Sequence, residues 1–386
     1  MPKLLLISNW LPEYRIPLYE RIIDEFGKEN VCYLWLHESD PDNISRKSKK
    51  IFENSHFSKK YLKTPFGPKI SIGFTKKVLK LKPTHVITLP TTYLETWYIW
   101  FIVKKLLDAK LILWDEEFEW IKSFKRRLIM PITSYINKNS DFILVPSNKH
   151  ALWQINQGVC EADVFLFPNV TNIGKDTKNV NEIQDIKEKY SLKDEKIITY
   201  VGQLIPRKGI TYLIDAYYDL LVENPKYVSE TCLMIVGDGI SKIELFKKTE
   251  KILKVGGRVI FTGQIENSEL VKYYSLSYFG VVPSVNINGE AEPHALVVNE
   301  FMALDKPVIT TNMVGATYSL CTGSLKDFRV REKSSKDIKK QLTKILNMDP
   351  FSYQNLQKSI NHEFIQYNNY SINIKVLNKI INKNTK

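Results

Sequence analysis

The stretch Ile198–Tyr217, ITYVGQLIPRKGITYLIDAY, combines a strand pattern, a turn and a helix pattern in direct succession. Its apolar run ends at Gly202, a short loop carries Arg207 and Lys208, and apolar residues then recur at intervals of three and four. A buried strand followed directly by an amphipathic helix is the building unit of parallel α/β sheets. The stretch therefore predicts an α/β fold in which this loop leaves the carboxyl end of a strand.

Nine more short apolar runs alternate with amphipathic segments along the 386-residue chain. They are KLLLIS, NVCYLWL, HVITLP, KLILW and FILVPS before the quoted stretch, and CLMIVGDG, RVIFTG, FGVVPS and PVITT after it. Continuous apolar runs are typical of parallel strands that are buried on both faces. The polar segment 171–195 divides the runs five and five, so we predict two doubly wound domains. In such sheets, ligands bind outside the carboxyl ends of the strands.

The composition is that of a globular protein, with 44% hydrophobic and 25% charged residues, which excludes disorder of the whole chain. Lys and Arg outnumber Asp and Glu by 55 to 42, which favours an anionic partner: nucleic acid, anionic lipid or a phosphorylated small molecule. The four cysteines form no CxxC pair, so a reducing cytoplasm fits best. The start, MPKLLLISNW, predicts a buried strand rather than a signal peptide, and YLETWYIWFIV is too short to span a membrane.

The segment 44–83 carries the strongest basic clustering of the chain. Five aromatic residues are interleaved with its lysines: Phe52, Phe57, Tyr61, Phe66 and Phe74. This mixture favours an anionic membrane surface or nucleic acid. A solvated lysine-rich helix with a loop would give the same pattern, so all three interpretations stay open.

The loop within Ile198–Tyr217 has the residues of an anion site. Gly202 permits close backbone approach, and Arg207 and Lys208 at a helix start offer charge-assisted donors to a phosphate. The loop is neither a Walker loop nor a dinucleotide fingerprint, and a solvated basic turn would look the same. A second glycine turn follows the next strand, in LMIVGDGISKIEL.

A third loop, GEAEPHALVVNE at Gly289–Glu300, follows the run FGVVPS. Because Pro suits a first helical turn, we expect a helix to begin near Pro293 and to leave the amides of residues 295–297 free for a phosphate. Carboxylates here would repel an anion, so Glu292 and Glu300 are expected to accept hydrogen bonds from hydroxyl groups. A ligand with both phosphates and hydroxyls is a nucleotide sugar. Two solvent-facing glutamates are the alternative.

Four linked motifs resemble retaining glycosyltransferases of the GT-B type, specifically glycosyltransferase family four (glycosyl transferases group 1), whose pattern is E-x7-E. They are YVGQLIPRKGITYLIDAY, LMIVGDGISKIEL, VIFTGQIENSELVKYYSLSYFGVVPS and EAEPHALVVNEFMALDKPVITT. RIPLYERI, LVPS and FPN resemble the family more loosely. The resemblance implies two Rossmann-like domains facing a central cleft. The acceptor domain would be 1–172, joined by a C-terminal helix at 366–386, and the donor domain would be 193–365.

The resemblance also implies roles for residues of this sequence. Arg207 and Lys208 would bind the donor diphosphate, Glu292 would hold a hydroxyl of the transferred sugar, and these three form the expected catalytic set. Glu300 would hold the ribose hydroxyls. The expected donor-binding set is Gly202, Gln203, Arg207, Lys208, Gly237, Asp238, Gly263, Ile265, His294, Ala295, Leu296, Val297 and Glu300.

The sequence departs from the family pattern at several points. Gln203 stands where the family usually has Arg, and no glycine-rich loop follows the first strand, where Arg15 could reach toward phosphate instead. The segment Trp114, Asp115 and Glu116 stands where many members have a histidine. Carboxylates and a Trp face suit sugar or acceptor contacts, although acids also favour a helix N-terminus.

These observations predict a cytoplasmic, metal-independent, retaining glycosyltransferase without a cofactor. The donor would be a UDP- or GDP-linked sugar, and the acceptor a glycan or polyprenyl-linked glycan of an envelope or capsule polysaccharide. The basic segment 44–83 suggests peripheral contact with the inner membrane, and no nucleic-acid module is present. Asp40-Pro41-Asp42 lies in a polar loop, so no metal is expected. A nucleotide-sugar epimerase and a catalytically silent sugar-nucleotide-binding subunit remain as alternatives.

Overall fold

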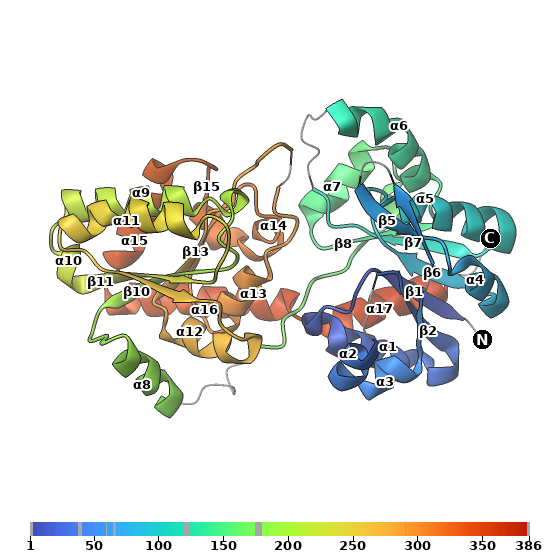
Figure 1. Ribbon diagram of the computed structural model, residues 1–386, viewed down its shortest axis with the longest axis horizontal. Coiled ribbons are helices and arrows are strands. Elements are labelled where there is room, and N and C mark those ends of the chain that lie inside the picture. Colours follow the sequence, from blue (N-terminus) through green and yellow to red (C-terminus); the bar gives the residue numbers. More distant parts are fainter. Residues whose placement is uncertain are drawn as a thin grey trace. The chain divides into compact units, whose positions relative to one another are not determined.

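The computed structural model describes residues 3–37, 41–58, 60–64, 67–118, 124–173, 180–289 and 291–383. Asp40 and Phe66, named above, lie outside the described residues. The chain divides into two compact units, shown in Figure 1. Unit 1 is Met1–Asn172 with Asn369–Lys386, and unit 2 is Ile173–Asn368. Each unit has its own parallel sheet, so the predicted α/β class with two doubly wound domains is confirmed.

Unit 1 holds a seven-stranded parallel sheet with the order β3-β2-β1-β6-β7-β8-β9. The strands are β1 (Leu4–Ser8), β2 (Val31–Trp35), β3 (Ser55–Phe57), β6 (His85–Thr88), β7 (Lys110–Trp114), β8 (Phe142–Val145) and β9 (Val164–Leu166). All five predicted N-terminal strands are present. The edge strands β3 and β9 were not predicted, because three residues are too few to show a pattern.

Helices cover both faces of this sheet (Figure 1). They are α1 (Ile16–Phe26), α2 (Pro41–Lys47), α3 (Lys49–Glu53), α4 (Thr75–Leu81), α5 (Leu94–Phe101) with the π-helix Ile102–Leu107, α6 (Phe124–Lys138), α7 (Asn148–Asn156) and α17 (Tyr370–Ile381). Leu4 and Leu6 pack with α17 residues Leu377 and Ile380, while Leu5 and Ile7 pack in a second cluster. Alternate strand residues thus bury both faces of the sheet.

A short antiparallel hairpin stands apart from the main sheet of unit 1. It consists of β4 (Tyr61–Thr64) and β5 (Gly67–Ser71), within the basic segment 44–83. Lys-rich α4 follows it in the chain. In the part of the chain that the structure describes, no helix is long and apolar enough to cross a membrane.

Unit 2 holds a six-stranded parallel sheet with the order β12-β11-β10-β13-β14-β15. Its strands are β10 (Lys196–Val201), β11 (Thr231–Val236), β12 (Val259–Gly263), β13 (Phe279–Val282), β14 (Val308–Thr311) and β15 (Arg329–Val330). Its helices are α8 (Val180–Lys189), α9 (Ile210–Glu223), α10 (Tyr227–Glu230), α11 (Lys242–Lys254), α12 (Leu270–Leu276), α13 (Leu296–Ala303), α14 (Thr317–Leu320), α15 (Ser335–Leu346) and α16 (Pro350–Tyr367). All five predicted strands are present.

The strand order of unit 2 reverses between β10 and β13, which are hydrogen-bonded neighbours. The loops after these two strands leave toward opposite faces of the sheet, and the space between them is the usual ligand site of doubly wound folds. The two loops that follow β10 and β13 contain Arg207, Lys208 and Glu292. The topology therefore brings the predicted catalytic set to the expected edge.

Candidate active site

The loop after β10 is fixed by backbone contacts to the end of β13. Gly209 begins α9 with a left-handed φ of 64°, and a Cβ added there would lie 2.1 Å from the carbonyl oxygen of Pro283. Only glycine fits this position without displacing backbone. The Val285 amide also donates to the Arg207 carbonyl at 2.8 Å. These contacts hold Arg207 and Lys208 beside the loop that follows β13.

Glu292 is held in extended backbone by a bridge to Val314. Its amide donates to the Met313 carbonyl at 2.9 Å, and its carbonyl accepts from the Gly315 amide at 2.8 Å. Ala295, the N-cap residue of α13, also has extended backbone, with φ −88° and ψ 99°, so α13 begins at Leu296. The prediction that the helix begins near Pro293 is therefore wrong by three residues (296 − 293).

Three charged side chains of the predicted catalytic set meet in one cluster. Glu292 Oε2 accepts from Arg207 Nη1 at 2.7 Å and from Lys208 Nζ at 2.6 Å, and the Glu292 residue is buried. The cluster holds two positive charges and one negative charge, so it keeps an excess positive charge. The sequence predicted that these residues share a site, but it did not predict that the carboxylate would neutralise one of the cations.

The first turn of α13 adds backbone donors close to this cluster in sequence. Ala295 is its N-cap residue, and the amides of Leu296 and Val297 have no carbonyl partner within the helix by the geometry of a first turn. A helix N-terminus favours anions. The predicted phosphate donors at 295–297 thus keep their position at a helix start, although the helix starts later than expected.

Glu300 lies within α13, and its carboxylate accepts a hydrogen bond from the hydroxyl of Tyr274 on α12. Burial raises the pKa of Glu300, and the hydrogen bond from Tyr274 lowers it in part. On the same segment, His294 Nε2 lies 3.0 Å from Oδ1 of the buried Asn299. Sequence reasoning missed Tyr274, because no motif pairs a tyrosine with a glutamate 26 residues away.

The glycine turns after β10, β11 and β12 meet through their backbones. The Gly202 amide donates to the Val236 carbonyl at 3.0 Å, and the Gly237 amide donates to the Gly263 carbonyl at 2.9 Å. A Cβ on Gly237 would lie 1.9 Å from the Gly202 carbonyl oxygen. The structure therefore brings together all three glycines that were predicted to contact the donor.

The remaining predicted residues surround this backbone cluster. The Gln203 carbonyl accepts from the Tyr200 hydroxyl at 2.8 Å, and Ile265 packs partly buried against the core of unit 2. Asp238 accepts from Lys242 Nζ at 2.7 Å, which holds the pKa of this exposed carboxyl below its usual value. Asp238 is thus ionised and already engaged with a cation.

Residues 182–369 match the family model described as Glycosyl transferases group 1. The matched residues make up just under half of the chain and are called the group 1 domain after this match. The match covers the whole candidate site of unit 2, including Arg207, Lys208, Glu292 and Glu300.

Curated relatives with named functions are similar to part of this chain. The capsular polysaccharide biosynthesis glycosyltransferase CapM of Staphylococcus aureus is 28% identical over 181 residues, which are 46% of this chain and 43% of CapM. A GDP-mannose-dependent alpha-(1-6)-phosphatidylinositol monomannoside mannosyltransferase of Mycolicibacterium smegmatis is 29% identical over 140 residues, which are 36% of this chain and 35% of the relative. The chain thus spans less than half the length of these curated relatives.

Solved structures resemble the chain beyond the group 1 domain. The crystal structure of Anabaena Alr3699/HepE in complex with UDP has a TM-score of 0.74 and 14% identity, and covers 98% of this chain and 99% of that chain. An apo structure of OtsA has a TM-score of 0.70 and 11% identity, with full coverage of both chains. At these identities the likeness shows the fold alone, and it confirms the predicted GT-B class.

A cavity of about 220 Å³ lies within the group 1 domain beside the loop after β10. Its lining includes Ile205, Pro206, Val285 and Lys333. Ile205 and Pro206 directly precede Arg207, so the cavity adjoins the loop that holds the cationic pair.

Outside the group 1 domain, Arg15 and Glu116 form the main charged contact at the carboxyl end of β7. Arg15 Nη2 donates to Glu116 Oε1 at 2.7 Å, and the guanidinium lies 3.9 Å from the centroid of the Trp114 ring. Asn169 also donates to Glu116 Oε1, at 2.8 Å. The sequence suggested Arg15 as a phosphate ligand and Trp114 with Glu116 as a sugar site, and unit 1 joins the two suggestions in one cluster.

Asp115 points away from this cluster into the core of unit 1. Its Oδ2 accepts from Gln154 at 3.0 Å, and its Oδ1 accepts from the Glu117 amide at 2.7 Å. Burial, with a smaller contribution from the charge of Glu117, raises the pKa of Asp115 to about 8. The raised pKa favours the neutral form of Asp115.

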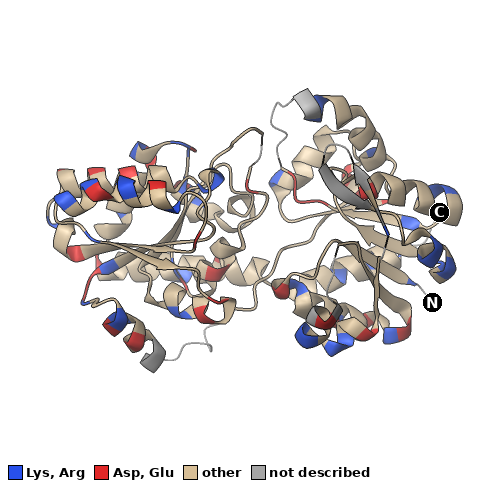
Figure 2. Ribbon diagram, viewed as in Figure 1, with Lys and Arg blue, Asp and Glu red and all other residues tan. Residues whose placement is uncertain are grey.

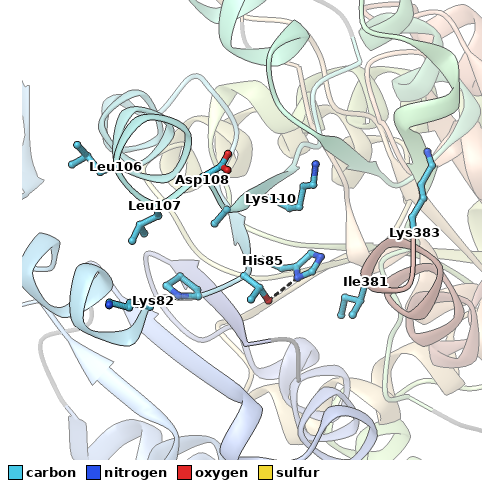
Figure 3. Close-up of a pocket in the computed structure, with 11 residues that line it drawn as sticks. Lys82, His85, Leu106, Leu107, Asp108, Lys110, Ile381 and Lys383 are labelled. Carbon is cyan, nitrogen blue, oxygen red and sulfur yellow. Dashed lines mark hydrogen bonds between the residues drawn. The ribbon is translucent and has the colours of Figure 1, made fainter. Parts of the chain in front are cut away.

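A larger cavity of about 580 Å³ lies in unit 1, at the opposite edge of the sheet (Figure 3). Its walls come from the starts of β6 and β7 and from the end of α17, with His85, Lys110 and Lys383 among the lining residues. Two of its lysines already have carboxylate partners: Lys110 lies 3.0 Å from Asp141, and Lys383 lies 3.3 Å from Asp163. Because it opens at the amino ends of the strands, this cavity is separate from the candidate site.

Proposed function

We propose that this chain is a retaining glycosyltransferase that moves a sugar from a nucleotide diphosphate sugar to a glycan or lipid-linked acceptor. The observation that carries the proposal is the meeting of Arg207 and Lys208 on Glu292, at the switch point of a group 1 domain. Cations bind a diphosphate, and a carboxylate accepts hydrogen bonds from sugar hydroxyls. One cluster thus offers both kinds of contact.

The diphosphate would bind to Arg207, Lys208 and the first-turn amides of α13. These donors gain strength as negative charge develops on the leaving phosphate, so they favour the transition state over the bound donor. When phosphate oxygens take over the two cations, the Glu292 carboxylate becomes available to a hydroxyl of the transferred sugar. In the absence of donor, Glu292 keeps the two cations side by side, which pre-organises the site.

Glu300 would accept hydrogen bonds from the ribose hydroxyls. Its partly buried carboxylate is oriented by Tyr274, which would leave the second carboxylate oxygen for the ligand. The glycine backbones at Gly202, Gly237 and Gly263 would allow the base and the ribose to approach without side-chain collision. A UDP- or GDP-linked sugar fits this arrangement.

Transfer with retention would use attack from the face that the phosphate leaves. The acceptor hydroxyl oxygen bonds to the anomeric carbon as the bond from that carbon to the phosphate oxygen breaks, and the departing phosphate takes the hydroxyl proton. No side-chain base is required for this step. Arg207 and Lys208 would supply the charge stabilisation, without a metal ion or a cofactor.

The acceptor would bind unit 1, with Trp114 and the Arg15–Glu116 pair as its contacts. One relative is named for capsular polysaccharide synthesis, and another for a phosphatidylinositol-linked acceptor. These names support an envelope or capsule polysaccharide precursor as the acceptor, reached at the inner face of the membrane.

Thermal-shift measurements with UDP-, GDP- and ADP-sugars test the donor, because ligand binding raises the apparent stability by mass action. The matching sugar is then incubated with lipid-linked acceptor extract. A transferase releases nucleoside diphosphate only with acceptor, and nuclear magnetic resonance reports the anomeric configuration of the product. An altered sugar without acceptor would indicate an epimerase, and binding without turnover would indicate a silent subunit. Absence of any shift with all three donors would contradict the proposal.

A further inference from the structure

Helix α6 of unit 1 exposes an apolar stripe to solvent. Leu128, Ile132 and Tyr135 are 63, 45 and 54% exposed, and their spacing of four and three puts them on one face. The opposite face is buried and includes the polar residues Thr133 and Asn137. A surface helix of a globular protein normally has its polar side outward, so α6 has the reverse arrangement.

Helix α5 has the same reversed arrangement. Leu94, Tyr98 and Phe101 are 36 to 51% exposed, again at a spacing of four and three. Its buried residues include Glu95, whose Oε1 lies 3.0 Å from His37 Nε2. Single exposed apolar residues are normal on protein surfaces, but two helices that each expose an apolar stripe are not explained in this way.

The two stripes belong to one surface. The rings of Trp100 on α5 and Tyr135 on α6 make an edge contact, with centroids 5.7 Å apart. Figure 1 shows α5 and α6 as neighbours on the same side of the sheet of unit 1. We define the α5–α6 face by its six exposed residues: Leu94, Tyr98, Phe101, Leu128, Ile132 and Tyr135.

The α5–α6 face is flanked by more cations than acids. The segment Leu94–Leu107 contains Lys104 and Lys105, and its single acid is the buried Glu95. Lys104 pairs with Asp141 at 2.8 Å, and the exposed Asp108 directly follows the segment. α6 contains four Lys or Arg residues and no Asp or Glu. Figure 2 shows the ribbon of α6 tan over most of its length, with blue close to its first turn. Apolar side chains flanked by an excess of cations match an anionic lipid surface.

Helix α4, near the end of the basic segment 44–83, adds to the same side of unit 1. Thr75 Oγ1 at the start of α4 lies 2.5 Å from the hydroxyl of Tyr98, and the Phe74 ring makes an edge contact with the Tyr98 ring. α4 itself contains three lysines and no acid. The lysines of α4 therefore add positive charge beside α5.

From these observations we infer that the α5–α6 face is a membrane-docking surface, which inserts its apolar side chains among anionic lipids without crossing the bilayer. A protein partner would be expected to meet some acidic side chains at the rim, as in mixed-charge interfaces, whereas this rim is cationic. An anionic bilayer satisfies both the apolar stripes and the cations.

The position of this face suits an amphiphilic acceptor. α5 and α6 follow the carboxyl ends of β6 and β7, the edge of the sheet that also carries Trp114 and Glu116. Tyr93, which directly precedes Leu94 in the loop after β6, is also exposed. This link to an acceptor rests on the proposed function, whereas lipid binding itself does not.

The test measures binding to vesicles and needs neither donor nor turnover, so its failure is distinct from failure of the proposed function. Purified full-length protein is floated with phosphatidylcholine vesicles that contain about 30 mol% phosphatidylglycerol, at low and at high salt. The wild type is expected to bind at low salt and to lose binding as salt rises. The double variant Leu128→Glu/Ile132→Glu is expected to bind at least about tenfold less.

Phe101→Glu changes a residue of the α5–α6 face, and Phe351→Glu is its matched control. Phe351, on α16 of unit 2, is 71% exposed but lies outside the face, so its variant is expected to bind like the wild type. Circular dichroism melting shows whether each variant is folded, and exposed positions are expected to leave the midpoint within a few degrees. Unchanged vesicle binding by the double variant, or no binding by the wild type, would overturn the inference. A wild-type dimer that Leu128→Glu/Ile132→Glu converts to a monomer would also overturn it, because the face would then be covered by a second copy.

Discussion

The ammonium nitrogen of Lys208 lies 2.6 Å from Oε2 of Glu292, although 84 positions separate the two residues in the chain. The contact exists because β10 and β13 are adjacent and parallel, so the loops that follow them leave the sheet at the same edge. It joins the residue proposed to bind the donor phosphate to the residue proposed to hold the sugar. Each side chain therefore sets the position of the other before a ligand arrives.

Lys208→Met is expected to lower donor affinity or turnover by about 100-fold, because it removes a cation from the leaving diphosphate. Calorimetric titration of the donor and initial rates measure the two quantities. Lys251→Met is the matched control, since Lys251 forms a comparable ion pair with Asp215 at 2.7 Å on the helices α9 and α11. Near-normal kinetics for Lys208→Met would contradict the site assignment.

Glu292→Gln is expected to destabilise unit 2 by about 1–3 kcal/mol, because it leaves two neighbouring cations without their carboxylate. Adding Lys208→Met should recover part of this loss, since one uncompensated charge is removed. Urea unfolding of the two single variants and the double variant gives the coupling free energy. Strictly additive effects would show that the contact contributes nothing to stability.

Gly237→Ala is expected to destabilise unit 2 by about 3 kcal/mol or more, because its Cβ would collide with the Gly202 carbonyl oxygen. Gly263→Ala is the comparison. Its φ is +75°, but a Cβ there meets no atom within 4 Å, so only the backbone strain of about 1–2 kcal/mol applies. The melting temperatures of the two variants measure their losses of stability relative to the wild type. Equal losses in Gly237→Ala and Gly263→Ala would contradict the close backbone approach at Gly237.

The stability of unit 1 is expected to fall as the pH rises from about 4 toward 8, because of Asp115. Its folded-state pKa of about 8 lies above the unfolded value, so the folded state retains a proton that the unfolded state has lost in this range. Asp115→Asn cannot ionise and should flatten the decline in unfolding free energy. Asp108→Asn, at an exposed carboxyl, is the control. An identical pH dependence in the wild type and Asp115→Asn would refute the assignment.

Tyr274→Phe is expected to raise the pKa of Glu300 further, because the hydrogen bond from Tyr274 now lowers it. If ionised Glu300 holds the ribose, donor affinity falls as the pH falls through its pKa. That fall should occur at higher pH in the variant. Donor dissociation constants between about pH 5 and 8 measure the shift. Tyr273→Phe serves as the neighbouring control, and superimposable profiles would exclude a role for the Tyr274 contact.

Most of the fold could be predicted because its strands are long enough to carry a signal. Each of the ten apolar runs became a strand, since a parallel strand covered on both faces needs apolar residues at successive positions. β3, β9 and β15 could not be predicted, because two or three residues at a sheet edge are buried too little to show a pattern. The spacing of Leu377 and Ile380 indicated a C-terminal helix, and the family resemblance implied that this helix joins the N-terminal domain, against whose strands α17 packs.

The amino-acid sequence specifies the residue types that follow the strands: glycines that permit close backbone approach, the cations Arg207 and Lys208, and the carboxylates Glu292 and Glu300. How these residues pair depends on the tertiary structure. Extended backbone at Glu292 and Ala295 delays the start of α13 to Leu296, and strand order brings Glu292 to the two cations. The tertiary structure likewise joins Tyr274 to Glu300 and Arg15 to Glu116. Local sequence fixes backbone preference and charge, whereas contacts between distant residues depend on which strands become neighbours in the sheet.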